Sequence, residues 1–387
     1  MKGVILVENS FVHPYMPNSV PENKKAMLDE LGINSVEDIY KSIIPDELLY
    51  KERLDIPEPI RSEYELKRHV MGILNRDITT EEYTSFLGAG CYKHQVPAIC
   101  DEINSRGEFL TAYCGDTYSD HGKMQAIFEY TSMMGELLDT DVVSYTTYDG
   151  GQAVASSLRM AVRAVREKGM AGKVILVPKT MNPEIYSQVV QYCRNVAEVR
   201  KIAYEPETGL MDLEELKEQL AKKNVAAVFF ENPTYLGNFE TRGEEIAKLA
   251  HDAGAYCVVQ TEVAALGIME SPVNQGADIV CGDIQPLGMH IQFGGGQAGF
   301  IACNQNMDLV EQFPTYMYGI TETEKEDTYG WGRAMNYRSS HGSRENAKEY
   351  FGTETGLWAI TAGVYLASMG PQGMYELGET IIQNAAY

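Results

Sequence analysis

The stretch Tyr256-Cys-Val-Val-Gln-Thr-Glu-Val-Ala-Ala-Leu-Gly267 has the pattern of a short buried strand that ends in an acid, Glu262. Its first residues are apolar without alternation, as in a strand that is covered on both faces. Similar apolar runs recur along the chain, and the expected strands are Val174–Val177, Val199–Ala203, Ala226–Phe230, Tyr256–Val259 and Ile279–Cys281. Regular spacing of such runs predicts a largely parallel, doubly wound sheet.

Segments of helical period lie between the expected strands. They are Gln152–Lys168, Pro183–Arg194, Leu213–Lys222 and Gly243–Ala253. Gly254 follows the last of them, where a glycine in the left-handed conformation commonly ends a helix. We therefore expect one large α/β domain over residues 85–372.

The first 84 residues differ from this domain in composition. They are charged, and prolines separate helical patterns at Glu22–Leu31, Val36–Lys41 and Ser62–Asn75. Because such helices carry little apolar surface of their own, they must pack on something larger, either the body of this chain or another subunit. We expect an N-terminal helical arm over residues 1–84, and the start of a C-terminal helix or linker over residues 373–387.

Composition excludes several classes of function. The 387 residues are 44% hydrophobic and carry a formal charge of −23, which argues against nucleic acid and anionic lipid as partners. Seven cysteines are scattered without a C-x-x-C pair, so neither a disulfide framework nor a zinc site is indicated. No signal peptide and no apolar run of about 18 residues is present. We expect a cytoplasmic protein with no metal and no membrane span.

A glycine pair opens the long helix that follows Tyr148. In Thr147-Tyr-Asp-Gly-Gly-Gln-Ala, the free N–H groups of Gly150 and Gly151 and the helix dipole suit a phosphate. An ordinary helix start with Asp149 as its N-cap would give the same pattern without a ligand. Both interpretations stay open.

Glu262 has a similar double interpretation. In pyridoxal-phosphate enzymes of the aspartate aminotransferase fold, which this pattern resembles, an acid at the end of this strand pairs with the pyridine nitrogen of the cofactor. A solvated glutamate at the carboxyl end of a strand would look the same.

The segment that carries the covalent anchor in such enzymes has no lysine here. Residues 279–302 contain the strand, the turn and the glycine run expected of that region, but no lysine lies between Lys248 and Lys325. Gln285 and His290 stand near the vacant position, and His290 fits either a cofactor contact or a structural histidine. A cofactor fold without its anchor predicts a subunit that completes the active site of a partner.

The chain resembles subunit 1 of two-subunit glycine decarboxylase, the P-protein family of the glycine cleavage system. The segments that carry the resemblance occur in the family's order along nearly the whole chain. They are Tyr15-Met-Pro-Asn, Ser85-Phe-Leu-Gly-Ala-Gly-Cys-Tyr, Phe109-Leu-Thr-Ala-Tyr, Gln125-Ala-Ile-Phe-Glu-Tyr, Tyr148-Asp-Gly, Gly276-Ala-Asp-Ile-Val, Phe293-Gly-Gly and Ala367-Ser-Met-Gly-Pro-Gln-Gly.

The resemblance implies a pyridoxal-phosphate fold type I domain with a mostly parallel seven-stranded sheet. It implies a lysine-bearing P-protein subunit 2 that holds pyridoxal phosphate as a Schiff base, so that the cofactor is not bound covalently to this chain. It further implies a heterotetramer, a small amino-acid substrate, glycine, and a lipoylated H-protein that accepts the aminomethyl group.

The family's pocket loops map onto three residues that we expect to contact the substrate: Tyr92, Thr111 and Tyr113. Tyr92 and Tyr113 also fit buried aromatic anchors of the subunit interface. The residues that we expect near the cofactor are Tyr148, Asp149, Gly150, Gly151, Glu262 and His290.

The chain departs from the family pattern in three places. The family's Thr-Pro-Tyr-Gln after Thr-Ala-Tyr is replaced by Cys114-Gly-Asp-Thr-Tyr, and a later conserved segment by residues 347–356. A different loop changes the shape and charge of a pocket, so glycine as the substrate is in question. The sequence also ends where the family continues into a small C-terminal domain, and we expect that domain to be absent or truncated.

Three hypotheses therefore remain. The chain is a subunit of a glycine-decarboxylase-type enzyme, a paralogous subunit for another amino acid or N-substituted glycine, or a non-catalytic scaffold for its partner. A self-sufficient hydrolase or dehydrogenase is not supported. Gly-x-Ser-x-Gly and His-Glu-x-x-His motifs are missing, and Gly294-Gly-Gly-Gln-Ala-Gly precedes a strand instead of joining a strand to a helix.

Overall fold

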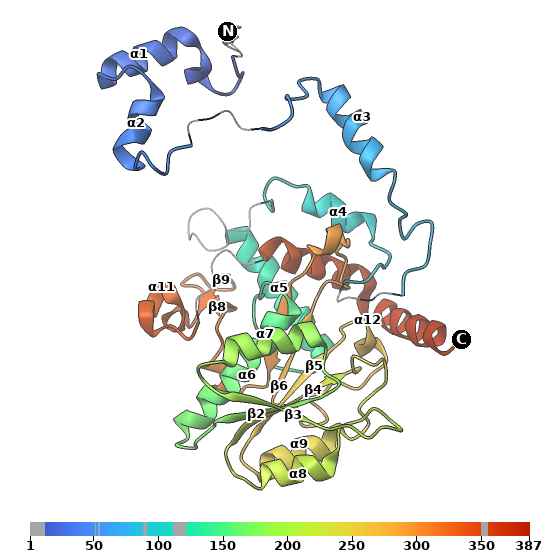
Figure 1. Cartoon of the computed structure of the whole chain (residues 1–387). Helices are drawn as coiled ribbons and strands as arrows, with labels where there is room; N and C mark the ends of the chain where they lie inside the picture. Colours follow the sequence, from blue (N-terminus) through green and yellow to red (C-terminus); the bar gives the residue numbers. More distant parts are fainter. Residues whose placement is uncertain are drawn as a thin grey trace. The chain divides into compact units, whose positions relative to one another are not determined.

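The computed structural model describes residues 12–50, 52, 55–86, 88, 91–110, 121–349 and 355–387. The chain divides into two compact units, Met1–Glu82 and Tyr83–Tyr387, and Figure 1 labels many of their helices and strands.

The first unit contains short helices that have no buried residue. They are η1 Pro17–Ser19, α1 Pro21–Leu31, α2 Val36–Ile43 and α3 Glu63–Leu74. Ser35 and Asp38 form a reciprocal capping box at the start of α2, and the Ser62 hydroxyl accepts the Glu65 N–H at the start of α3. All three predicted helical patterns are confirmed.

The second unit is built on a seven-stranded sheet with the order β1-β7-β6-β5-β4-β2-β3. The strands β2 to β6 are parallel, whereas β7 is antiparallel to both β6 and β1. Their bounds are β1 Val142–Val143, β2 Val174–Pro178, β3 Glu198–Ile202, β4 Val225–Asn232, β5 Tyr256–Thr261, β6 Ile279–Asp283 and β7 Gly299–Cys303. The predicted fold class, a mostly parallel seven-stranded α/β sheet, is confirmed.

Helices cover both faces of this sheet, which explains the continuous apolar strands (Figure 1). One core joins side chains such as Leu176, Val228 and Val259 to helices on the first face: α5 His121–Leu138, α8 Leu213–Leu220, α9 Gly243–Asp252 and α12 Gly356–Ala386. The other core joins Ile175 and Phe229 to helices on the second face: α6 Gly150–Glu167, α7 Pro183–Cys193 and α10 Met307–Val310. Neighbouring strand residues enter opposite cores, as the pleat requires.

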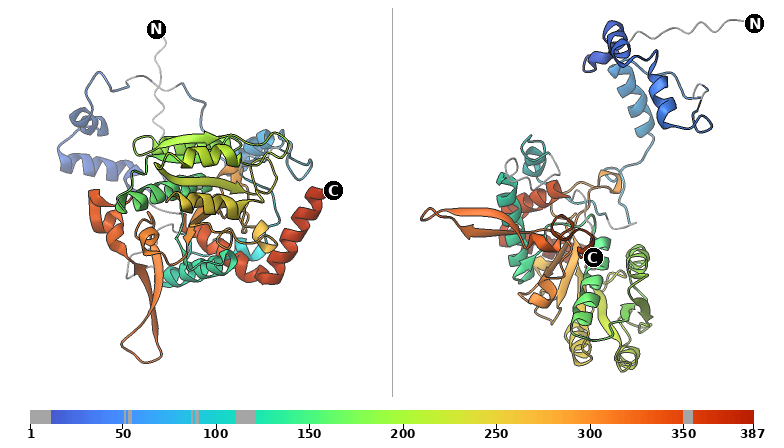
Figure 2. Two further views of the ribbon diagram at one scale, coloured as in Figure 1. Left: turned by 90° about the horizontal axis from the view of Figure 1, so that it is seen from below. Right: turned by 90° about the vertical axis from the view of Figure 1, so that its left-hand side faces the viewer.

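Three features lie outside the sheet. A two-stranded ribbon, β8 Met317–Glu322 with β9 Tyr329–Ala334, projects from the body in Figure 2. Helix α4, Ala98–Asn104, is tied to α12 because the Thr361 hydroxyl donates to the Asn104 Oδ1 at 2.6 Å. Short helical turns are η2 Ala265–Gly267, η3 Gln292–Gly294, η4 Asn336–Arg338, α11 Ser340–Ser343 and η5 Arg344–Asn346.

Helix α12 begins well before the residue 373 that we expected for the terminal helix. Its two parts are separated at Gly370, with φ 62° and ψ −179°, and at Pro371 directly after it. A proline inside a helix removes one backbone donor, so the axis kinks there. Within the described residues, none of the helices combines the length and the apolar composition needed to cross a membrane.

Candidate functional site

Three acids lie at the carboxyl ends of three adjacent parallel strands. Glu231 is the second-last residue of β4, Glu262 directly follows β5, and Asp283 ends β6. Gln260 pairs with Glu231 on one side and with Cys281 on the other, so Glu262 and Asp283 lie at the same level two residues further on. In open α/β sheets this edge is where ligands bind. We call these three residues the strand-end acids.

Burial shifts all three carboxyl groups in the same direction. It raises the pKa of Glu231, of Glu262 and of Asp283 to about 7 each. Backbone N–H groups oppose the shift at each position, from Asn182 for Glu231 and from Ala264 for Glu262. The described part of the chain holds no group of three acidic, histidine or cysteine residues arranged to bind a metal ion. The raised pKa values favour the protonated form of these carboxyl groups more than in water.

Asp283 occupies the start of helix α6. Its Oδ2 accepts the Gly150 N–H at 2.8 Å, and its Oδ1 accepts N–H groups from Gln285 at 2.8 Å and from Ala298 at 3.4 Å. A carboxylate at a helix N-terminus is favoured by the helix dipole. The position at which a bound phosphate would meet Gly150 is thus taken by a side chain of the same protein.

The predicted N-cap of α6 is confirmed. The Asp149 carboxylate accepts the Gln152 N–H at 2.6 Å, and the Gln188 amide of α7 lies at 3.3 Å from its second oxygen. A Cβ added at Gly151 would lie 1.8 Å from the Gln188 Oε1. Tyr148 is 42% exposed, and its N–H donates to the Gln152 side chain. These residues lie together at one end of the sheet.

Tyr92 is held over the same edge by a side chain from the end of β6. The Gln285 Oε1 accepts the Tyr92 N–H at 3.2 Å, and the Gln285 Nε2 donates to the Tyr92 carbonyl at 3.1 Å. Burial raises the pKa of the Tyr92 phenol, and charge on the strand-end acids, Glu262 first, raises it further. The phenol therefore keeps its proton at neutral pH and is a hydrogen-bond donor beside carboxyl groups.

His290 lies beside helix α4. Its Nε2 lies 3.0 Å from the Asp101 Oδ1 on α4, and its side chain is 53% exposed. This polar contact between α4 and the turn after β6 favours the structural interpretation of His290, and its role near the cofactor stays a prediction. Thr111 and Tyr113 lie outside the described residues, as does the loop Cys114 to Asp120.

The residues of this edge do not fit pyridoxal phosphate within this chain alone. The Asp283 side chain accepts the Gly150 N–H at the helix start that would hold the phosphate. The segment from residue 249 to 324 offers no lysine. The phosphate roles of Gly150 and Gly151 stay predictions, and the contact of Gly150 with Asp283 counts against them.

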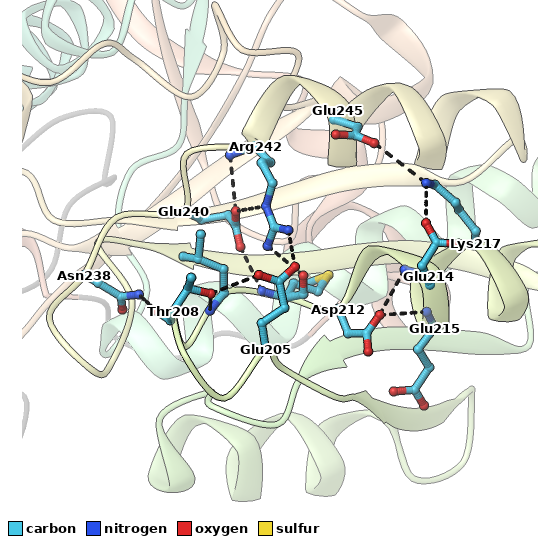
Figure 3. A network of polar contacts seen from close by, with 12 residues as sticks. Glu205, Thr208, Asp212, Glu214, Glu215, Lys217, Asn238, Glu240, Arg242 and Glu245 are labelled. Atoms are coloured by element: carbon cyan, nitrogen blue, oxygen red, sulfur yellow. Dashed lines mark hydrogen bonds and ion pairs between the residues drawn. The ribbon is translucent and has the colours of Figure 1, made fainter.

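A second polar cluster near the end of β4 is structural. Figure 3 shows the Arg242 guanidinium between two carboxylates, with its Nη1 2.6 Å from Glu205 and its Nε 3.1 Å from Glu240. The Arg242 Nη2 also donates to the Met211 carbonyl at 2.7 Å. The Glu240 side chain is 2% exposed, and this partly buried pair lies at the start of α9, where Arg242 is the N-cap.

Sequence reasoning missed Glu231 and Asp283, and it noted Gln285 only for its position. The available signal was that each follows an apolar strand at the ligand-binding edge of the predicted sheet. Their partners could not be read from sequence spacing, since Gln285 meets Tyr92 across 193 positions of the chain.

Comparison with known proteins supports the class of protein that the fold and the absence of an anchor lysine indicate. The family model of the glycine cleavage system P-protein matches residues 13–387. A probable glycine dehydrogenase (decarboxylating) subunit 1 of Pyrococcus horikoshii is 37% identical over 375 residues, which cover 96% of this chain and 81% of that protein. The protein of the same name from Staphylothermus marinus is 34% identical and covers 97% of this chain, which spans 80% of it.

Solved structures agree at the level of the fold. The crystal structure of glycine decarboxylase (P-protein) of the glycine cleavage system, in inhibitor-bound form, superposes with a TM-score of 0.80 and 31% identity, covering 95% of this chain and 78% of that one. A sphingosine-1-phosphate lyase of Burkholderia pseudomallei shares the fold, with a TM-score of 0.56 and 13% identity over 88% of this chain and 76% of that one.

The sheet, its covering helices and the ligand-binding edge define an enzyme chain of the pyridoxal-phosphate fold type I class. Within that class, the chain belongs to the glycine cleavage system P-protein family.

Proposed function

We propose that this chain is the lysine-less subunit of a glycine-decarboxylase-type enzyme and completes the active site of a lysine-bearing partner subunit. One observation carries the proposal: the chain has the P-protein fold along its length, but its own edge has Asp283 on the helix start and no lysine in the anchor segment. Relatives named subunit 1 support the existence of a partner.

Bound to the partner's lysine, pyridoxal phosphate supplies the electron sink for the pair released when glycine loses carbon dioxide. In this proposal the aminomethyl group then passes to the lipoyl group of an H-protein, and the assembly is an α2β2 heterotetramer in the cytoplasm. Light scattering of the coexpressed pair tests the assembly directly.

The contribution of this chain is to bind and orient the substrate. The neutral Tyr92 phenol, about half exposed, is a donor suited to a substrate carboxylate. Thr111 and Tyr113 are assigned the same task from the family resemblance. Tyr148, Asp149 and Glu262 shape the edge behind Tyr92.

The test is glycine–bicarbonate exchange by the coexpressed pair with lipoylated H-protein. Exchange that requires both subunits supports the proposal, and its absence from the purified pair overturns it. The same assay with N-methylglycine separates the paralogue hypothesis, which the altered loop beginning at Cys114 motivates. A preference for N-methylglycine over glycine would assign the chain to that second function.

A further inference from the structure

We propose that Gln285 is a positioning residue whose side-chain amide clamps the backbone of Tyr92. Tyr92 is one of the residues that this subunit is proposed to contribute to the active site. This inference rests on the proposed function, because Tyr92 is assigned there to the shared pocket. It assigns a task to the residue that stands in the lysine-free segment.

The contacts of Gln285 are unusually complete for a side chain. It is 0% exposed, and its amide engages both backbone polar groups of Tyr92, the N–H at 3.2 Å and the carbonyl at 3.1 Å. The second N–H of the amide donates to the Met289 carbonyl at 3.0 Å. One side chain thus pairs with Tyr92 as a neighbouring β-strand would, through one acceptor and one donor.

Gln285 itself stands on a rigid base. Its backbone N–H donates to Asp283 at the end of β6, and its carbonyl accepts the Met289 N–H at 3.3 Å. The turn between them closes through Gly288, whose φ of +87° favours glycine. A Cβ at Gly288 would also lie 2.8 Å from the Cys100 Sγ, so this turn admits only glycine without a shift.

Tyr92, by contrast, stands on an irregular and partly exposed segment. Residues 91–97 form neither helix nor strand, and Tyr92 is 47% exposed. Among the described residues, the Tyr92 carbonyl has one further polar contact, with the His94 Nδ1 at 3.0 Å. Since the ring is only partly buried, the direction of the phenol depends on the backbone that Gln285 holds.

The chemistry of the clamp selects glutamine. Methionine has nearly the same length but makes none of the three hydrogen bonds, whereas asparagine has the same amide on a side chain that is one methylene shorter. Gln285→Met therefore removes the clamp with little change of volume. Gln312→Met is a matched control, because Gln312 is also 0% exposed and hydrogen-bonded, but to Arg163 and Glu167 at the far end of α6.

The first arm measures hydrogen exchange in the coexpressed complex and does not depend on activity. In Gln285→Met we expect the Tyr92 amide to exchange at least about tenfold faster, because its acceptor is lost. Gln312→Met should leave that amide unchanged at a similar cost in stability. Unchanged protection of Tyr92 in Gln285→Met overturns the proposal. If that variant does not fold, Gln285→Asn takes its place with the same expectation and the same contradicting result.

The second arm measures kcat and KM for glycine in a double-mutant cycle. Gln285→Met and Tyr92→Phe should each raise KM several-fold, and the double variant should be no worse than about twofold beyond the poorer single variant, because both act through one phenol. Fully additive losses contradict the positioning role. If the wild-type pair does not turn over glycine, the proposed function fails, while the exchange arm still decides the role of Gln285.

Discussion

The Asp283 carboxylate accepts the Gly150 N–H at 2.8 Å, although the two residues are 133 positions apart in the chain. This contact places a carboxyl group of the same chain on the helix start that a cofactor phosphate would use. The end of β6 and the start of α6 are therefore joined by a hydrogen bond within the subunit.

Replacing Asp283 with asparagine should weaken this junction. Asparagine keeps one acceptor, but its NH2 group then faces a backbone N–H that Asp283 accepts. We expect a loss of about 1–3 kcal/mol in the free energy of unfolding at pH 5, where both oxygens of protonated Asp283 still accept backbone N–H groups. Urea unfolding measures it, and Asp308→Asn, at an exposed position, is the control. Above pH 7 the difference should shrink, because burial raises the pKa of Asp283 to about 7 and the wild type then loses the stability of the bound proton, whereas asparagine does not titrate. Equal stability of Asp283→Asn and wild type at pH 5 would contradict the junction.

Buried carboxyl groups should make the protein less stable as the pH rises. Burial raises the pKa of Glu231 from 4.5 to about 7, so the folded state binds the extra proton between these values. The stability that this proton contributes is complete below about pH 4 and is lost as the pH rises through about 7. Glu231→Gln should therefore gain about 1–3 kcal/mol at pH 8 and much less at pH 5.

Glu240→Gln provides the contrast for that measurement. Glu240 is buried nearby but is paired with the Arg242 Nε at 3.1 Å, so its removal leaves a partly buried cation with one partner fewer. We expect Glu240→Gln to lose stability at pH 8. A loss of stability at pH 8 in Glu231→Gln as well would contradict this account. It would show that hydrogen bonds stabilise the Glu231 carboxylate in the folded state by more than burial destabilises it.

Gly299→Ala should disturb the loop that carries Asp149. A Cβ at Gly299 would lie 2.2 Å from the Asp149 carbonyl oxygen and 2.1 Å from the Thr147 hydroxyl. Because one of these atoms is backbone, the loop must move, and we expect a loss of about 2–4 kcal/mol. Gly332→Ala on β9 is the control, since a Cβ there meets nothing within 4 Å. Thermal unfolding compares the two, and similar midpoints would refute the close approach.

Tyr92→Phe separates a contributing subunit from a scaffold. Removing the phenol oxygen takes away a donor without changing the ring, so a subunit that binds substrate should lose roughly tenfold in kcat/KM, about 1.4 kcal/mol. Tyr375→Phe on α12, a similarly exposed tyrosine at 48%, should leave turnover unchanged. Steady-state exchange by the pair is the measurement, and undiminished turnover in Tyr92→Phe would favour the scaffold.

The sheet was predictable from the sequence where strands are buried on both faces. The predicted strand Val174–Val177 differs from β2 by one residue, since its apolar run ends where the strand ends. Gly254, with φ +77°, ends α9 where the sequence placed a helix-terminating glycine. Such features depend on local patterns, which a sequence shows directly.

The site was less predictable because its contacts join distant segments. Nothing around Gln285 indicates that its amide meets Tyr92, and the antiparallel strand β1, only Val142–Val143, is too short to give a pattern. Helix α12 begins at Gly356 because packing carries it past Gly370 and Pro371, which read in sequence as a boundary. Tertiary contacts decided all of these positions.

The central claim is that the cofactor's covalent anchor belongs to a partner. It is tested by intact mass after borohydride reduction of the coexpressed pair with pyridoxal phosphate. We predict an adduct on the lysine-bearing partner and none on this chain, alone or in the pair. A stoichiometric adduct at one lysine of this chain would contradict the account.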